Sequence, residues 1–124
     1  MTRTIVAQAL GLSLVALTFS ASAQAQGDVQ YRTCSNNGVV IVRANEFTSC
    51  GLARNVQRRL RLTGRNRRRL NQRMNRYGRR GPFRVNRVRS PTTGKRYNLR
   101  CQVGARDLLC ENLRRRIWVG FRVR

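Results

Sequence analysis

The chain has 124 residues, of which 27 are lysine or arginine and four are aspartate or glutamate, so its formal net charge is +23. Histidine is absent, which excludes Ser-His, Cys-His and paired-histidine catalytic sites. Such a charge opposes compaction and favours contact with polyanions. Lys95 is the only lysine. The bidentate grip of arginine on phosphate or sulfate would explain this bias, and so would the base composition of a GC-rich genome.

The N-terminal segment has the pattern of a secretory signal peptide. Arg3 supplies a short positive region, and residues 5–19 form an apolar run of signal-peptide length. Two small-residue cleavage patterns follow within 21–25. The run is shorter than the roughly 20 apolar residues that span a bilayer, although an uncleaved anchor is the alternative. We predict a signal peptide over 1–25 and a single exported domain, secreted or periplasmic, over 26–124.

All four cysteines lie in the predicted mature domain. An even number of cysteines in a small exported chain is typical of disulfides. A four-thiolate zinc site would usually show closely spaced CxxC pairs, and this sequence has none. Four cysteines allow three pairings. The hairpin described below favours Cys101 with Cys110, which leaves Cys34 with Cys50.

The first predicted elements are a strand and an amphipathic helix. Asn37-Gly38 is a turn pair, and the β-branched run after it predicts a strand over 39–42. Thr48 or Ser49 can cap the following helix. The apolar residues of this helix share one stripe, and its arginines fall mostly off that stripe. The stripe consists of Leu52, Ala53, Val56 and Leu60.

Residues 64–80 form an arginine-rich segment with a helical period. Thr63-Gly64 predicts a break before it, and Gly78 and Gly81-Pro82 predict its end. The segment is either a second helix or a continuation of the first, and repulsion between like charges three and four residues apart opposes its folding in isolation. Its apolar residues form one narrow stripe of Leu70, Met74 and Tyr77.

Two strands joined by a turn are predicted next. Residues 82–90 alternate apolar and polar side chains, with an irregularity at Asn86-Arg87. Pro91 and Gly94 mark the turn. Residues 96–103 have an apolar or cysteine side chain at every second position, which places these side chains on one face of the strand.

The remaining residues predict a hairpin and a final strand. A two-residue loop at Ala105-Arg106 would set Cys101 opposite Cys110 in a non-hydrogen-bonded pair, where side chains are closest. The closing segment is a strand with Trp118 and Phe121 as large apolar anchors, and we expect both side chains, like that of Tyr97, in the core. The order of a strand, one or two helices and a meander of about four strands predicts an α+β fold. In this fold the helices pack on a small antiparallel sheet with two disulfides.

Three motifs in the chain resemble a family of small exported bacterial domains that are abundant in actinobacteria. The family pattern is roughly T-S-C-x-x-A-x-N-V, then S-P-x-T-G-x-x-Y-x-x-x-C, then V-x-C. The matching residues are Thr48, Ser49, Cys50, Ala53, Asn55, Val56, Ser90, Pro91, Thr93, Gly94, Tyr97, Cys101 and Cys110. The resemblance implies a secreted, disulfide-bearing module and no particular activity. The chain departs from the family in its arginine-rich segment 64–80 and in lacking a glycine-rich stretch after the last cysteine.

Catalytic and metal-binding patterns are weak. A glycosidase would need two carboxylates converging on a cleft. The chain offers only Asp28, Glu46, Asp107 and Glu111. Asp107 and Glu111 could approach each other across the predicted hairpin. The simpler explanation for their presence is turn formation by Asp107 and charge balance by Glu111. No phosphate-binding loop, zinc pattern or dinucleotide motif is present in the sequence. We expect a protein that is not an enzyme and uses no cofactor or metal.

Positive charge and the export pattern together predict electrostatic binding of an anionic polymer outside the cytoplasm. From Phe47 to Arg106 the chain has no carboxylate. Candidate polymers are lipopolysaccharide, teichoic acids, acidic glycans and extracellular DNA. The predicted contact residues are Arg58, Arg61, Arg65, Arg67, Arg68, Arg69, Arg73, Arg76, Arg79 and Arg80.

Three other functions remain open. The arginine-rich segment alone would suit nucleic-acid recognition inside a cell, which the export pattern disfavours. A basic amphipathic helix can also lie on an anionic membrane surface, as in membrane-active or antimicrobial proteins. The third alternative is a disulfide-linked interaction or inhibitor module that docks an acidic protein.

Overall fold

The computed structural model describes residues 29–124, which form one six-stranded sheet and two α-helices. The predicted signal peptide lies outside the described residues, and the predicted α+β fold is confirmed. The strands are β1 (Tyr31–Asn36), β2 (Val40–Asn45), β3 (Phe83–Arg89), β4 (Arg96–Val103), β5 (Asp107–Asn112) and β6 (Ile117–Val123). The helices are α2 (Cys50–Arg59) and α3 (Arg67–Arg80), with the short 3-10 helix η2 (Leu113–Arg115) before β6.

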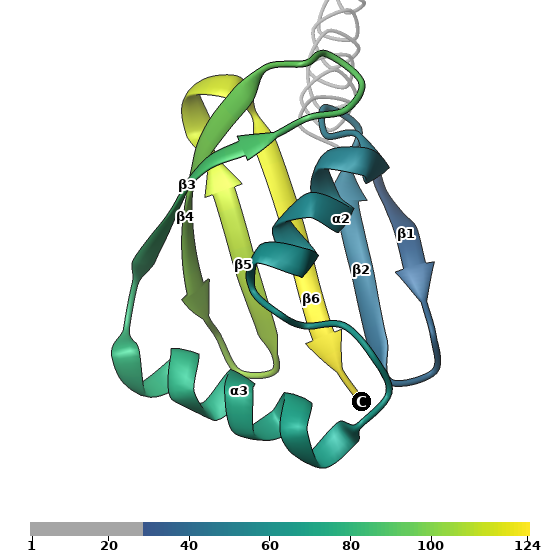
Figure 1. Cartoon of the computed structure of the whole chain (residues 1–124). Helices are drawn as coiled ribbons and strands as arrows, with labels where there is room; N and C mark the ends of the chain where they lie inside the picture. The colour runs from purple at the N-terminus through teal and green to yellow at the C-terminus, as the bar shows by residue number, and fades with distance from the viewer. Residues whose placement is uncertain (1–28) are drawn as a thin grey trace, which may run out of the picture.

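The sheet is antiparallel and has the strand order β1-β2-β6-β5-β4-β3. Its last four strands form the predicted meander, and β6 returns to pair with β2. Helix α2 contacts both β2 and β3, although these strands lie near opposite ends of the strand order. The sheet therefore curls around α2, while α3 lies across the ends of the strands and contacts β4 and β6 (Figure 1).

Helix α2 begins at a side-chain cap, packs its apolar stripe on the sheet and forms hydrogen bonds with β3. Ser49 is the N-cap, and its hydroxyl accepts a hydrogen bond from the Leu52 amide at 3.1 Å. The predicted apolar stripe is buried against the sheet. On the β3 side, the Asn55 side chain donates to the Arg89 carbonyl at 2.8 Å, and Arg59 donates to the Asn86 carbonyl at 2.9 and 3.0 Å.

Helix α3 is a separate helix, as one of the two alternatives predicted. Asn66 caps it by accepting from the Arg69 amide at 3.1 Å, and Leu70 and Met74 are buried beneath it. The prediction that Gly78 ends the helix was wrong, because Gly78 lies inside it. The helix ends at Gly81, whose φ of 78° is readily adopted by glycine, and Pro82 cannot continue the helical hydrogen bonding.

Strand β1 was missed by the sequence analysis. Most of its side chains are exposed and polar, so it lacks the apolar alternation that marks a half-buried strand. Tertiary pairing forms it instead, because β1 pairs antiparallel with β2, with a register shift between Thr33 and Ser35. The turn at Asn37-Gly38 joins the two strands, and the Asn37 side chain accepts from the amides of Val39 and Val40 at 2.9 and 2.8 Å.

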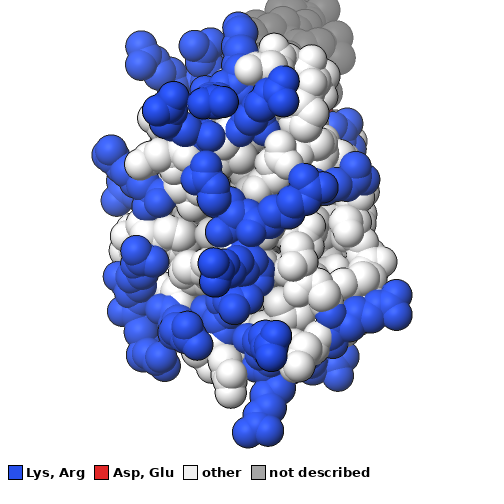
Figure 2. All heavy atoms as spheres, in the orientation of Figure 1, with Lys and Arg blue, Asp and Glu red and all other residues white. Residues whose placement is uncertain are grey.

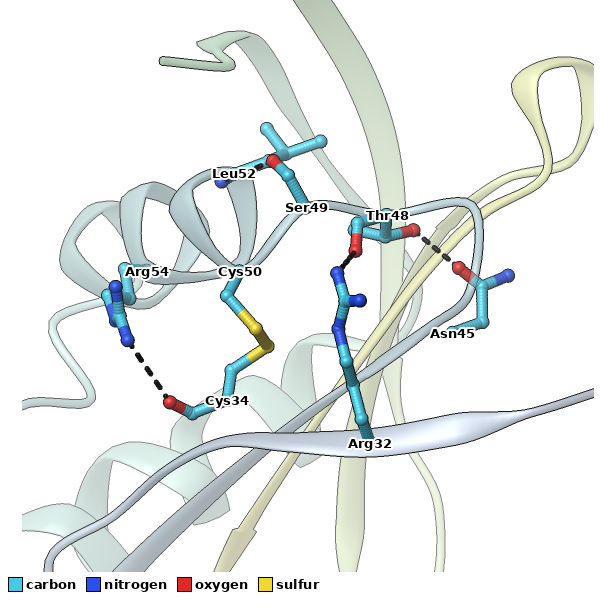
Figure 3. The surroundings of a disulfide bond; sticks show 8 residues. All are labelled: Arg32, Cys34, Asn45, Thr48, Ser49, Cys50, Leu52 and Arg54. Carbon is cyan, nitrogen blue, oxygen red and sulfur yellow. Dashed lines mark hydrogen bonds between the residues drawn. A yellow bond between two sulfur atoms is a disulfide. The ribbon is translucent and has the colours of Figure 1, made fainter. Parts of the chain in front are cut away.

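The predicted disulfide pairing is confirmed. Cys101 faces Cys110 across the β4–β5 hairpin, with their Cα atoms 4.0 Å apart. Cys34 pairs with Cys50 and joins β1 to the first residue of α2 (Figure 3). Beside this Cys34–Cys50 disulfide, the guanidinium of Arg54 donates to the Cys34 carbonyl at 3.3 Å.

Trp118 does not belong to the core, contrary to the prediction. The side chains of β6 alternate, so Ile117, Val119 and Phe121 face the helices and Trp118 lies on the opposite, outer face. There its ring meets Tyr31 edge to face, with ring centroids 4.7 Å apart. The indole also covers Gly120, where a Cβ atom would lie 2.8 Å from the Trp118 ring. Glycine at this position therefore lets the indole lie flat on the sheet.

Removing the disulfide between β1 and α2 tests how far the fold depends on it. Serine at both Cys34 and Cys50 should lower the free energy of unfolding by about 2–4 kcal/mol, because the link restricts the unfolded chain. Urea denaturation under oxidising conditions measures this loss. A non-reducing peptide map should show Cys101 still linked to Cys110. A change below about 0.5 kcal/mol with that link intact would contradict the expectation.

Candidate anion-binding surface

The side of the sheet covered by α2 and α3, here called the helix side, is covered with basic side chains. Figure 2 shows lysine and arginine across this whole view and no aspartate or glutamate. The carboxylates of Asp107 and Glu111 lie on the other face of the sheet, because they alternate along β5 with Leu108 and Cys110, which face the core. Positive charge on the helix side is therefore not offset by neighbouring carboxylates.

The outer face of the sheet has mixed charge. Arg122 and Asp107 form a bidentate ion pair, with Nε–Oδ1 and Nη2–Oδ2 distances of 2.6 and 3.1 Å. Hydrogen bonding and Coulomb attraction to Asp107 raise the pKa of the Arg122 guanidinium. Glu111 stands opposite Arg100 in the sheet. Asp107 and Glu111 lie four residues apart on one strand, roughly 13 Å, so β5 does not bring them together as a catalytic pair.

The arginines predicted as polyanion contacts lie along the helix side. One of them belongs to the end of α2, two to the following loop and seven to α3. All are exposed except Arg73, which is half-buried because its guanidinium donates to the Arg61 carbonyl. The exposed residues are Arg58, Arg61, Arg65, Arg67, Arg68, Arg69, Arg76, Arg79 and Arg80.

A hollow of about 550 Å³, here called the arginine hollow, opens between the end of α2 and α3. Two hydrogen bonds fix the helices beside it: the Tyr77 hydroxyl donates to the Leu60 carbonyl at 2.9 Å, and Arg73 donates to the Arg61 carbonyl. The Tyr77 ring also stacks on Phe83, with centroids 4.9 Å apart. The hollow is lined by Arg59, Arg61, Arg73, Arg76, Tyr77, Arg79 and Arg80.

A second hollow of about 570 Å³, here called the bulge hollow, lies between α2 and β3. It adjoins the first, since Arg59 lines both. Sequence reasoning missed its arginines except Arg58, because α2 and β3 are far apart along the chain. The irregularity predicted at Asn86-Arg87 was the only signal, and it is a register shift in β3. The lining residues are Asn55, Arg58, Arg59, Arg87, Val88, Arg89 and Arg96.

The first turn of α3 adds charge where the helix itself is positive. Arg67, Arg68 and Arg69 occupy this turn, which has no acidic residue. A helix N-terminus carries a partial positive charge and is stabilised by anions rather than cations. These arginines therefore destabilise the helix slightly, and a bound anion would relieve that effect.

Neither a membrane span nor a metal-binding cluster is found in residues 29–124. No helix in this range is both long and apolar enough to cross a membrane. No group of three or more histidine, cysteine, aspartate or glutamate side chains in the same range could hold a metal ion.

The described chain is thus a small disulfide-linked α+β domain with a basic helix side. Comparison with protein-family models, curated proteins and solved structures finds no match. The resemblance to small exported actinobacterial domains therefore stays a prediction. Two disulfides are typical of a protein that folds outside the reducing cytoplasm.

The hydroxyl of Tyr77 can be tested for its role beside the arginine hollow. Tyr77→Phe should lower the free energy of unfolding by about 0.5–1.5 kcal/mol, because it removes the bond to the Leu60 carbonyl and keeps the stacked ring. Urea denaturation measures the change. The control is Tyr97→Phe, whose hydroxyl lies 3.4 Å from the exposed Thr93 hydroxyl and should matter less. Equal losses in both variants would contradict the role of Tyr77.

Proposed function

We propose that this protein is an exported, non-enzymatic module that binds anionic polymers through its helix side. One observation carries the proposal. The arginine hollow and the bulge hollow share Arg59, and no carboxylate lines either of them. Together with the exposed arginines of α3, they make a basic surface on which Figure 2 shows no carboxylate. The signal-peptide pattern and the disulfides support a secreted or periplasmic location.

The chemistry of the surface favours phosphate or sulfate groups. An arginine guanidinium is planar and presents a fork of donors that matches these oxyanions in a bidentate geometry. Repulsion among the crowded guanidinium groups falls when a polyanion binds, and released counterions add to the affinity. A polymer can contact both hollows and the first turn of α3 at once, which a single small anion cannot do.

Packing of α3 supports surface binding rather than insertion into a membrane. Leu70 and Met74 are 1% and 7% exposed, so the apolar stripe of the helix is already used in the core. An interfacial helix buries such a stripe in the lipid headgroup region. Here the charged side of α3 is the side that remains free for a partner.

Salt-dependent binding tests the proposed function. Fluorescence titration with a labelled DNA duplex and with dextran sulfate should show tight binding at low salt that weakens steeply as salt rises. Replacing Arg65, Arg68 and Arg69 with glutamine should weaken binding to the duplex. The slope of log K against log salt should become shallower by about 2–3, since each phosphate contact contributes about 0.9.

The control removes the same charge from the outer face of the sheet. Arg43, Arg84 and Arg114 are exposed there, and their replacement by glutamine should change the slope much less. Absence of binding to both polymers at low salt would refute the proposed function. Equal losses in the two triple variants would refute the assignment to the helix side. Dye leakage from anionic vesicles would instead support the membrane-active alternative.

A further inference from the structure

Three non-glycine residues of the described chain have positive φ, and all three are arginines. They are Arg61, Arg87 and Arg116, with φ of 57°, 57° and 58°. This left-handed conformation costs an L-residue roughly 1–2 kcal/mol, whereas glycine adopts it freely. Arg61 lines the arginine hollow, and Arg87 lines the bulge hollow. Backbone strain at a ligand site is a recurrent feature of functional residues.

Arg61 occupies a position that usually belongs to glycine. Its amide donates to the Arg58 carbonyl at 3.0 Å, and the Leu62 amide donates to the Gln57 carbonyl at 3.1 Å. This pair of bonds is the helix-ending motif in which glycine is the common residue at the left-handed position. Glycine would adopt this left-handed conformation with less strain than arginine. The requirements of the fold therefore do not explain why this position carries an arginine.

The arginine hollow is also held in shape before any ligand arrives. Side chains of α3 bond to the carbonyls of Leu60 and Arg61, the two residues that directly follow α2. Arg59 bonds to the main chain of β3 at Asn86 and stays in place between the two hollows. Preorganised donors lose less entropy on binding than donors on a mobile loop.

The charge of the hollow selects a ligand with several negative charges. Six arginines and one tyrosine line it, and no carboxylate does. A single monovalent anion would leave most of this charge uncompensated. The volume of about 550 Å³ falls within the range of small-molecule sites, roughly 300–1,000 Å³.

From these observations we propose that the arginine hollow is a discrete site for a compact group bearing two or more phosphates, with Arg61 as one of its binding residues. This inference rests on the proposed function and specifies a part of the same surface. The phosphates of a lipid headgroup and of a free polyphosphate share this chemistry.

Replacing Arg61 with glycine separates ligand binding from folding. Glycine suits the left-handed backbone, so Arg61→Gly should keep or raise the thermal stability of the protein. Loss of the guanidinium should weaken binding of tripolyphosphate by about 10- to 100-fold, because it removes a hydrogen bond between two charged groups. Isothermal titration calorimetry at constant ionic strength measures the affinity, and we expect one site per chain for the wild type.

Arg116→Gly is the matched control. It removes one positive charge and relieves the same backbone conformation, but Arg116 lies outside both hollows, with its guanidinium over the Phe47 ring. Its affinity for tripolyphosphate should stay within about twofold of the wild type, because the long-range effect of one charge is largely screened. Arg76→Gln, which leaves the backbone unchanged, should weaken binding in the same direction as Arg61→Gly.

The possible outcomes separate this inference from the proposed function. Equal weakening by Arg61→Gly and Arg116→Gly overturns the discrete site, and so does failure to bind tripolyphosphate while DNA or dextran sulfate still binds. Failure to bind any of these probes overturns both proposals. A second arm of the experiment measures binding to vesicles that contain a bisphosphorylated inositol lipid, with phosphatidylglycerol vesicles as the comparison. Binding that depends on Arg61 supports the site, whether the probe is tripolyphosphate or the inositol-lipid vesicle. The probe that binds more tightly identifies the source of the phosphates.

Discussion

Mutual repulsion among the arginine side chains is the constraint to which the rest of the structure is adapted. The chain has too few carboxylates to neutralise its cations, and the described residues contain a single ion pair, Arg122 with Asp107. Several guanidinium groups bond instead to main-chain carbonyls, as Arg59 does at Asn86 and Arg54 does at Cys34. These bonds join distant elements and leave the full positive charge in place, because a carbonyl dipole does not cancel it.

This use of arginine divides the basic residues into two kinds. Arg59 holds the register shift of β3 against α2, and Arg73 holds the end of α2 against α3. The guanidinium groups of Arg76 and Arg79 donate no hydrogen bond within the part of the chain that the structure describes. The first kind builds the hollows and the second kind is free to meet a ligand. Both kinds come from the same residue type, so composition alone cannot separate them.

Local signals in the sequence predicted much of the fold. The two-residue loop at Ala105-Arg106 set the register that pairs Cys101 with Cys110. A side-chain cap and an apolar stripe located α2, and an apolar stripe after a glycine break located α3. Features that depend on tertiary contact were missed. Strand β1 exists because β2 pairs with it, and the bulge hollow forms where α2 meets β3. Trp118 was misplaced although its alternation with Phe121 was visible, because its size suggested the core.

The separation of charge between the two faces of the sheet has a consequence for how the molecule approaches a partner. Asp107 and Glu111 both lie on the outer face, while no carboxylate lines either hollow of the helix side, so the domain has an electric dipole as well as a net charge. A polyanionic surface exerts a torque on such a dipole as well as an attraction. The domain should therefore arrive helix side first, with Tyr31 and Trp118 presented outward to whatever lies on the far side.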